Sequence, residues 1–197
     1  MEWLIPINTL QINNINIGNM VHTLKPIVPL SYKDLEQTFS SLSILLPSLR
    51  IKSFDPSTGH FVVSLSDNPI ILAKLQSLQD TLLEHIKSNY TSWFPNQRHT
   101  IKKPNDIRTG FQPLIYGTDL HLYCPIQPEI AENVPFYSNN KWSASGIQAG
   151  LLIPGSRIRI VLRIQGVSFH IHPTTGQWSG KFRFQHKLLA LLLPVCA

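Results

Sequence analysis

The sequence predicts an α+β fold in which two helices pack on a curved, mostly antiparallel sheet. The 15 prolines and 10 glycines are spread along all 197 residues, which favours many short elements joined by turns. Alternating apolar and polar residues, which are typical of half-buried strands, recur along much of the chain, whereas apolar residues at helical spacing occur in only two segments. Because no repeat or long linker interrupts the chain, we expect a single domain that spans residues 1–197.

The N-terminal part is expected to contain extended segments and one helix. Residues 2–30 read as short extended segments, because the prolines near their end forbid a helix across it. Between Leu35 and Leu46, apolar residues recur at spacings of four, three and four, and Pro47 follows. This spacing predicts a short amphipathic helix that ends at the proline.

A β-hairpin and a long helix are expected next. Two alternating runs, 49–55 and 60–66, flank the turn sequence Pro-Ser-Thr-Gly, which predicts the hairpin. Asn68 and Pro69 then supply a helix N-cap and a proline at the first helical position. Apolar residues at helical spacing follow, so we expect a helix that runs to about Tyr90 and covers one face of the sheet.

The remaining strands alternate with segments rich in turns. Proline and glycine interrupt residues 91–113 and 125–150, which we expect to be irregular. Short strands are expected between these segments, at 114–116 and 119–123, with a Gly-Thr turn between them. The last strands are expected at 158–164, 167–172 and 180–193.

Charge is unevenly distributed along the chain. Only 14% of the residues are charged, and 17 Lys plus Arg against 11 Asp plus Glu give a formal net charge of +6. All the acidic residues lie at or before Glu132, whereas residues 133–197 contain seven basic residues and no acid. Solvation of a strand explains exposed lysine and arginine, but it does not explain the lack of acids. We therefore expect the C-terminal third to bind a polyanion.

The basic residues of this third follow the two-residue period of a strand. Side chains of one parity point to one face of a strand, and here the other parity is mostly apolar. If the two strands join one sheet, their cations lie together on the face away from the core. Like charges beside each other destabilise a sheet unless an anion neutralises them. The cations concerned are Arg157, Arg159, Arg163, Lys181, Arg183 and Lys187.

Aromatic residues lie near this cationic face in the sequence. The candidates are Trp142, Phe169 and Trp178, and each could equally belong to the core. Rings beside a cationic groove suit sequence-tolerant binding of single strands, because every base has a face that can stack. The six cations and these three aromatic residues are therefore the candidate nucleic-acid-binding residues.

Other chemistry has weaker support in the sequence. His170 and His172 lie on one face of a strand, but no third ligand accompanies them, so we predict no metal site and no cofactor. Asp106, Asp119 and Glu129 could hold a metal in a nuclease, although solvated turns explain them better. No phosphate loop or nucleophile motif is present. We expect a protein without enzymatic activity, with a metal-dependent nuclease as the less favoured alternative.

Bulk composition bears on the compartment and the partners. No run approaches the roughly 18 apolar residues that a membrane span needs, and the N-terminus lacks the pattern of a secretory signal. Two cysteines are too few for a disulfide scaffold. We therefore expect a protein that is not secreted and has no membrane partner. The apolar residues from Leu188 onward could serve contacts in a homo-oligomer.

Three segments of the C-terminal third resemble the single-stranded-DNA-binding proteins of large eukaryotic DNA viruses and related virus-like elements. These segments cover residues 154–159, 162–168 and 178–187, and a weaker likeness extends to 49–83. The resemblance implies an OB-like barrel as the alternative to an open curved sheet. It also implies a role in viral DNA replication, in the host nucleus or at a cytoplasmic replication site. Within this family, the six cations would contact the DNA backbone and Trp178 would stack on a base.

One alternative function shares the same electrostatics. A virion protein, or another structural protein whose basic surface faces the genome, would also need a cationic sheet face. The sequence does not separate DNA from RNA as the ligand, because contacts to the 2′-hydroxyl have no linear motif. Single-stranded DNA is the expected partner, and RNA stays open.

Overall fold

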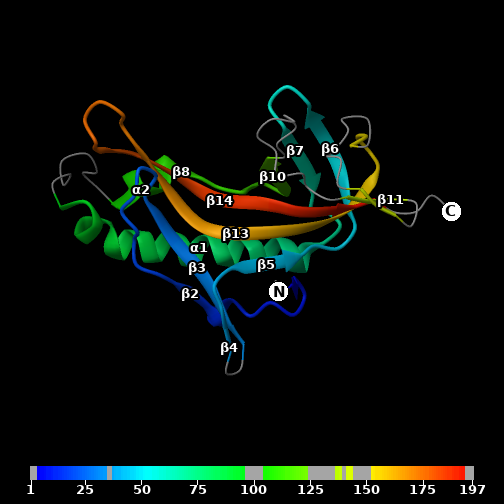
Figure 1. Cartoon of the computed structure of the whole chain (residues 1–197), viewed down its shortest axis with the longest axis horizontal. Coiled ribbons are helices and arrows are strands. Elements are labelled where there is room, and N and C mark those ends of the chain that lie inside the picture. Colours follow the sequence, from blue (N-terminus) through cyan, green and yellow to red (C-terminus); the bar gives the residue numbers. More distant parts are fainter. Residues whose placement is uncertain are drawn as a thin grey trace.

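A computed structural model describes residues 4–34, 37–95, 104–123, 136–138, 141–143 and 152–193. It confirms the predicted α+β class, since the strands form one large, curved, mostly antiparallel sheet with two helices beside it (Figure 1). Within the described residues the sheet stays open at its ends and does not close into a barrel.

The elements follow one another along the chain with short connections. The strands before the long helix are β1 (Ile5–Pro6), β2 (Ile15–Ile17), β3 (Ile27–Asp34), β4 (Gln37–Phe39), β5 (Leu42–Leu45), β6 (Leu49–Asp55) and β7 (His60–Ser64). The long helix is α1 (Pro69–Trp93). The elements after it are α2 (Pro104–Gly110), β8 (Phe111–Gln112), β9 (Ile115–Tyr116), β10 (Asp119–Tyr123), β11 (Phe136–Ser138), β12 (Lys141–Ser143), β13 (Arg157–Ile171) and β14 (Trp178–Leu192).

The two longest strands, β13 and β14, form an antiparallel ribbon through the middle of the molecule, which we call the ribbon (Figure 1). On its other edge, β13 pairs in succession with β3, β5 and β6. On its other edge, β14 pairs in parallel with β8 and β11. The ribbon therefore joins the N-terminal strands to the rest of the sheet.

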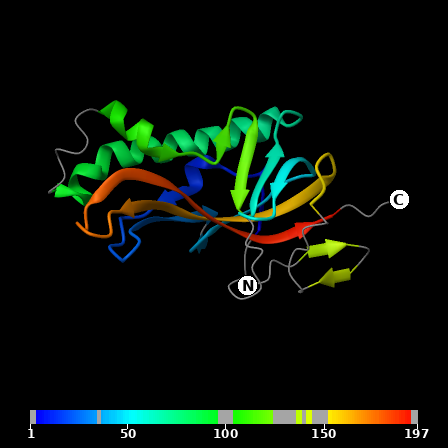
Figure 2. The same cartoon turned by 90° about the horizontal axis from the view of Figure 1, so that it is seen from above.

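Helix α1 lies along one face of the ribbon, as Figures 1 and 2 show. Its buried side chains recur at helical spacing and belong to the same core cluster as the apolar side chains of the ribbon. The helix begins at Pro69, as predicted. The ammonium group of Lys74 donates hydrogen bonds to the carbonyls of Ile7, Asn8 and Leu10, which ties the helix to the N-terminal turn.

A second group of strands stands on the same side of the ribbon as α1 (Figure 2). Strand β6 pairs with β7, β7 with β10 and β10 with β9, all antiparallel. The predicted hairpin at 49–66 is therefore confirmed, and so are the strands on both sides of the Gly-Thr turn at residues 117–118. This group brings the end of β10 to the edge of β14.

The predicted helix between Leu35 and Leu46 is wrong, because the described residues of this segment form the end strands β4 and β5. Strand β5 pairs with β13 on one edge and with β1 on the other. Its residues Leu42, Ser43 and Ile44 are buried without interruption. A fully buried strand needs no alternation, so its apolar residues matched helical spacing by coincidence.

Two further expectations need correction. Residues 91–113 were expected to be irregular, but Pro104 to Gly110 form the short helix α2. The strands expected at 158–164 and 167–172 are one continuous strand, β13. Register shifts at Gln165 and elsewhere let the ribbon curve without ending either strand.

Candidate nucleic-acid interface

The ribbon has an inner face, packed against α1, and an outer face that carries the predicted cations. Side chains directly opposite each other in the register share a face, and Arg163 is opposite Lys187 while Arg183 is opposite Ser168. On the inner face, Ile160, Leu162 and Phe182 are buried. The outer-face cations that are exposed are Arg157, Arg159, Lys181 and Arg183, while Arg163 and Lys187 are half-buried.

Local partners differ among these cations. Arg157 lies 3.4 Å from the Asp67 carboxylate and also donates a hydrogen bond to the carbonyl of Ser48. No carboxylate of the described residues forms an ion pair with Arg159, Lys181 or Arg183. The charge of these three side chains is therefore not neutralised locally by the described part of the chain.

A hollow of about 700 Å³ opens beside the exposed cations, and we call it the outer hollow. No carboxylate lines it among the described residues. Because Lys25 joins the cations of β14, residues far apart in the sequence make this hollow electropositive. The polar side chains that define it are Lys25, Ser168, His170, Lys181, Arg183 and Gln185.

A close backbone contact places Gln112 beside this hollow. A Cβ atom on Gly110 would lie only 1.9 Å from the carbonyl oxygen of Gly180, so glycine is needed where α2 ends against β14. Strand β8 then runs alongside β14, with Gln112 opposite Arg183 in the register. The Gln112 side chain is exposed and lines the outer hollow.

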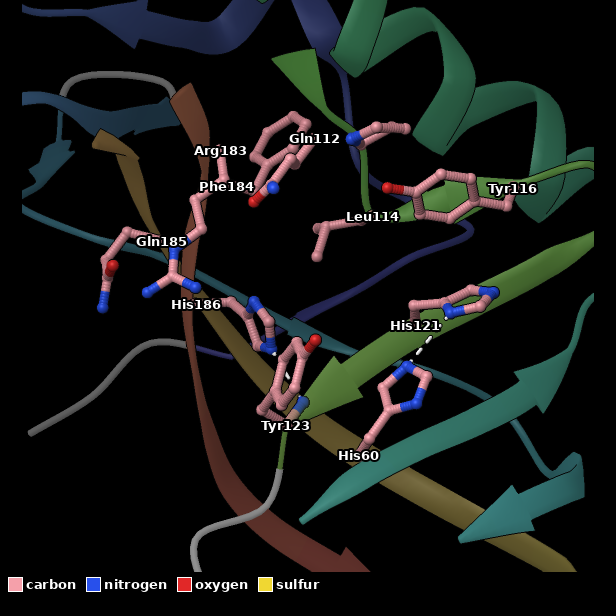
Figure 3. A pocket seen from close by; sticks show the side chains of 11 residues that line it. His60, Gln112, Leu114, Tyr116, His121, Tyr123, Arg183, Phe184, Gln185 and His186 are labelled. Carbon is pink, nitrogen blue, oxygen red and sulfur yellow. Dashed lines mark hydrogen bonds between the residues drawn. The ribbon is translucent and has the colours of Figure 1, made fainter. Parts of the chain in front are cut away.

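A second hollow, of about 530 Å³, lies where β10 meets β14 (Figure 3). Gln112, Arg183 and Gln185 line both hollows, so the two are contiguous. We call the second one the tyrosine hollow, because Tyr116 and Tyr123 line it with exposed fractions of 50% and 53%. Its other defining side chains are His60, His121 and His186.

The histidines of the tyrosine hollow are hydrogen-bonded and mostly neutral. The Nε2 of His60 lies 3.1 Å from the Nδ1 of His121. Burial lowers the pKa of His121, and the nearby His60 lowers it further. The Tyr123 backbone N–H donates to the Nε2 of His186 over 3.1 Å. Burial, followed by the charge of Arg183, lowers the pKa of His186 to about 4.

The predicted stacking role of Trp178 and Phe169 does not agree with their burial in the core. Trp178 is 2% exposed and Phe169 is 3% exposed. The Trp178 ring stacks on Phe94 with a centroid separation of 4.8 Å, and its Nε1 donates to the carbonyl of Lys181. A base could reach either ring only if this packing opened. Trp142 lies on β12, and its side chain is outside the described residues.

The strand pattern already contained the signal for this correction. Trp178 has the same parity as Phe182 and Phe184, whose side chains form the inner face. The half-exposed aromatic side chains are instead Tyr116 and Tyr123, which flank the turn between β9 and β10. Their exposure follows from the fold, and no local sequence pattern connects them with the ribbon.

The other candidate residues do not gather in one place. His170 contacts Ser179, with 3.0 Å between Nδ1 and Oγ, and Asp119 forms an ion pair with Lys52 at 2.7 Å. The side chains of Asp106 and Glu129 lie outside the described residues. In the described part of the chain, no group of three or more His, Cys, Asp or Glu side chains is placed to hold a metal ion.

Comparison of the chain with protein-family models, with curated proteins and with solved structures found no match. Neither helix of the described residues is both long and apolar enough to cross a membrane. The functional argument therefore depends on the geometry of the ribbon and its two hollows.

Proposed function

We propose that the outer face of the ribbon binds single-stranded nucleic acid, with DNA as the expected ligand, and that it does so without catalysis. The observation that carries this proposal is the placement of Arg159, Lys181 and Arg183 on one face, with no ion-pair partner among the described residues. Each phosphate that such a cation neutralises also releases a condensed counterion, which favours binding.

The shape of the site supports a flexible ligand over a rigid rod. The outer hollow and the tyrosine hollow meet at the edge of β14, so a bound strand would bend from one into the other. A single strand can follow such a path, whereas a duplex resists bending over a few base pairs. The resemblance of the C-terminal third supports a role in viral DNA replication.

A fluorescence-anisotropy titration with oligo-dT at several salt concentrations tests the proposal. The Lys181→Ala plus Arg183→Ala variant is expected to bind about tenfold more weakly, because two phosphate contacts are lost. The slope of log affinity against log salt should fall by about 1.4, at about 0.7 for each single-strand phosphate. Affinity that is absent at low salt, or unaffected by salt, would contradict the proposal.

A matched control removes the same charge from another surface. Lys87 forms an ion pair with Glu84 on α1, and Arg108 forms one with Asp80. The Lys87→Ala plus Arg108→Ala variant therefore loses two positive charges away from the ribbon and should bind oligo-dT almost as the native chain does. Equal affinity for duplex and single strand would favour the alternative of a structural protein that faces the genome.

A further inference from the structure

The tyrosine hollow has a chemistry different from that of the outer hollow. Two half-exposed phenol rings, Tyr116 and Tyr123, stand at its wall, and no carboxylate lines it among the described residues. Large aromatic side chains are normally buried, and two of them in one hollow indicate a ligand with its own apolar faces. The volume of about 530 Å³ is in the range of sites for small organic molecules.

We infer that the tyrosine hollow binds an unpaired nucleobase of the strand whose phosphates lie in the outer hollow. This inference rests on the proposed function and adds a second, base-directed contact to it. The geometry that carries it is the shared wall of Gln112, Arg183 and Gln185. A nucleotide at this wall has its phosphate near the Arg183 guanidinium and its base on the side of Tyr123.

The rings around Tyr123 form a preformed surface for stacking. The His60 ring lies 5.1 Å from Tyr123 and 5.1 Å from His121, measured between centroids. Tyr116 meets His121 edge-on at 4.8 Å. Figure 3 shows Tyr123 between His186 of β14 and His60 of β7. A base that stacks here loses little ordering entropy in the protein, because these rings already support each other.

The polar groups of the hollow suit the edge of a base. A neutral imidazole offers one donor and one acceptor, and a glutamine amide offers both as well. The lowered pKa values of His121 and His186 keep these two rings neutral at pH 7. A base edge also presents donors and acceptors without charge, so the hollow and the base match in polarity.

His186 acts as a positioning residue for this site. Its Nε2 accepts the backbone N–H of Tyr123, which fastens the end of β10 to β14. The contact fixes the distance between the Tyr123 ring and the cations of the outer face. Loss of this hydrogen bond is expected to weaken base binding through the position of Tyr123.

The experiment compares oligo-dT with an abasic oligonucleotide of the same length, which keeps the phosphates and lacks the bases. The native chain is expected to bind oligo-dT at least about fivefold more tightly than the abasic strand. The Tyr116→Ala plus Tyr123→Ala variant should lose most of this preference and keep the salt slope. The Tyr116→Phe plus Tyr123→Phe variant retains both rings and should keep the preference.

A spectroscopic measurement locates the contact. With ¹³C-labelled tyrosine, the ring resonances of Tyr116 and Tyr123 should shift on addition of oligo-dT and shift much less with the abasic strand. Thermal unfolding of each variant checks that the fold is kept.

Two outcomes separate the failure of this inference from the failure of the proposed function. Salt-dependent binding of both strands with equal affinity would overturn the base site and leave phosphate binding intact. The same holds if the alanine variant keeps the full preference for oligo-dT. No binding of either strand at low salt would overturn both.

Discussion

The inner and outer faces of the ribbon are built from alternate residues of the same two strands, yet they differ in every physical property. The inner face buries Phe169, Trp178 and Phe182 against the end of α1. The outer face exposes Arg159, Lys181 and Arg183. Burial of the first set stabilises the fold, whereas exposure of the second set leaves charge available to a ligand. Stability and binding are thus assigned to residues one position apart.

The largest effect on stability is expected for Trp178→Ala on the inner face. Removal of this buried ring leaves a cavity against Phe94 and Phe182, and such truncations cost about 3–5 kcal/mol. Urea unfolding followed by circular dichroism measures the change. The comparison of the two faces would fail if Trp178→Ala left the free energy of unfolding unchanged and weakened DNA binding.

The next effect is the loss of stability in acid through His186. Its pKa is lowered from 6.5 to about 4 in the fold, so the unfolded chain binds a proton more readily between these two values. The free energy of unfolding should therefore fall as the pH drops from 6.5 towards 4, by about 2 kcal/mol between pH 7 and pH 5.

A matched variant isolates the contribution of this histidine. Glutamine cannot take up a proton, and its amide oxygen can still accept a hydrogen bond. Unfolding of His186→Gln should depend less on pH than unfolding of the native chain over the same interval. An equal pH dependence in both proteins would show that other groups cause the acid sensitivity.

A smaller effect is expected at the ion pair between Lys52 and Asp119. The pair lies on the surface of the β6–β7–β10 group, where the two side chains are 49% and 23% exposed, and such pairs contribute about 0–1 kcal/mol. Asp119→Asn should change the midpoint of thermal unfolding by only a few degrees. Loss of Mg²⁺-dependent cleavage of DNA in this variant would instead support the nuclease alternative.

The smallest effect on stability is expected for Arg159→Ala on the outer face. The side chain is exposed and has no ion-pair partner among the described residues, so its removal should change the free energy of unfolding by less than about 0.5 kcal/mol. The same variant should weaken oligo-dT binding. A loss of stability larger than the loss of binding would contradict the division between the faces.

Sequence periodicity predicted the parts of the fold in which one face is buried and the other solvated. The hairpin at 49–66, helix α1 and the cationic parity of β13 and β14 are of this kind. Periodicity failed at β5, which is buried on both faces. It also failed for α2, which has only seven residues and so is too short for a repeating pattern.

The candidate site could be predicted only in part. The cations of the ribbon follow from alternation within each strand. The hollows, however, also need Lys25, Gln112 and Tyr123, which come from three separate segments. Their meeting at one edge of β14 depends on sheet topology, which no local pattern records. Trp178 was assigned to the surface because its distance along the chain was considered and its parity was not.

The extra residue in β13 has a consequence for how this protein can change. Gln165 has no partner in the register, which passes from Ile164 opposite His186 to Gly166 opposite Gln185. Beyond this point the outward positions switch from odd to even numbers, and Ser168 and His170 continue the side begun by Arg159. Deletion of one residue here would exchange the two sides of the far half of the strand. Phenylalanine 169 would then face water, so this short stretch tolerates substitutions far better than changes of length.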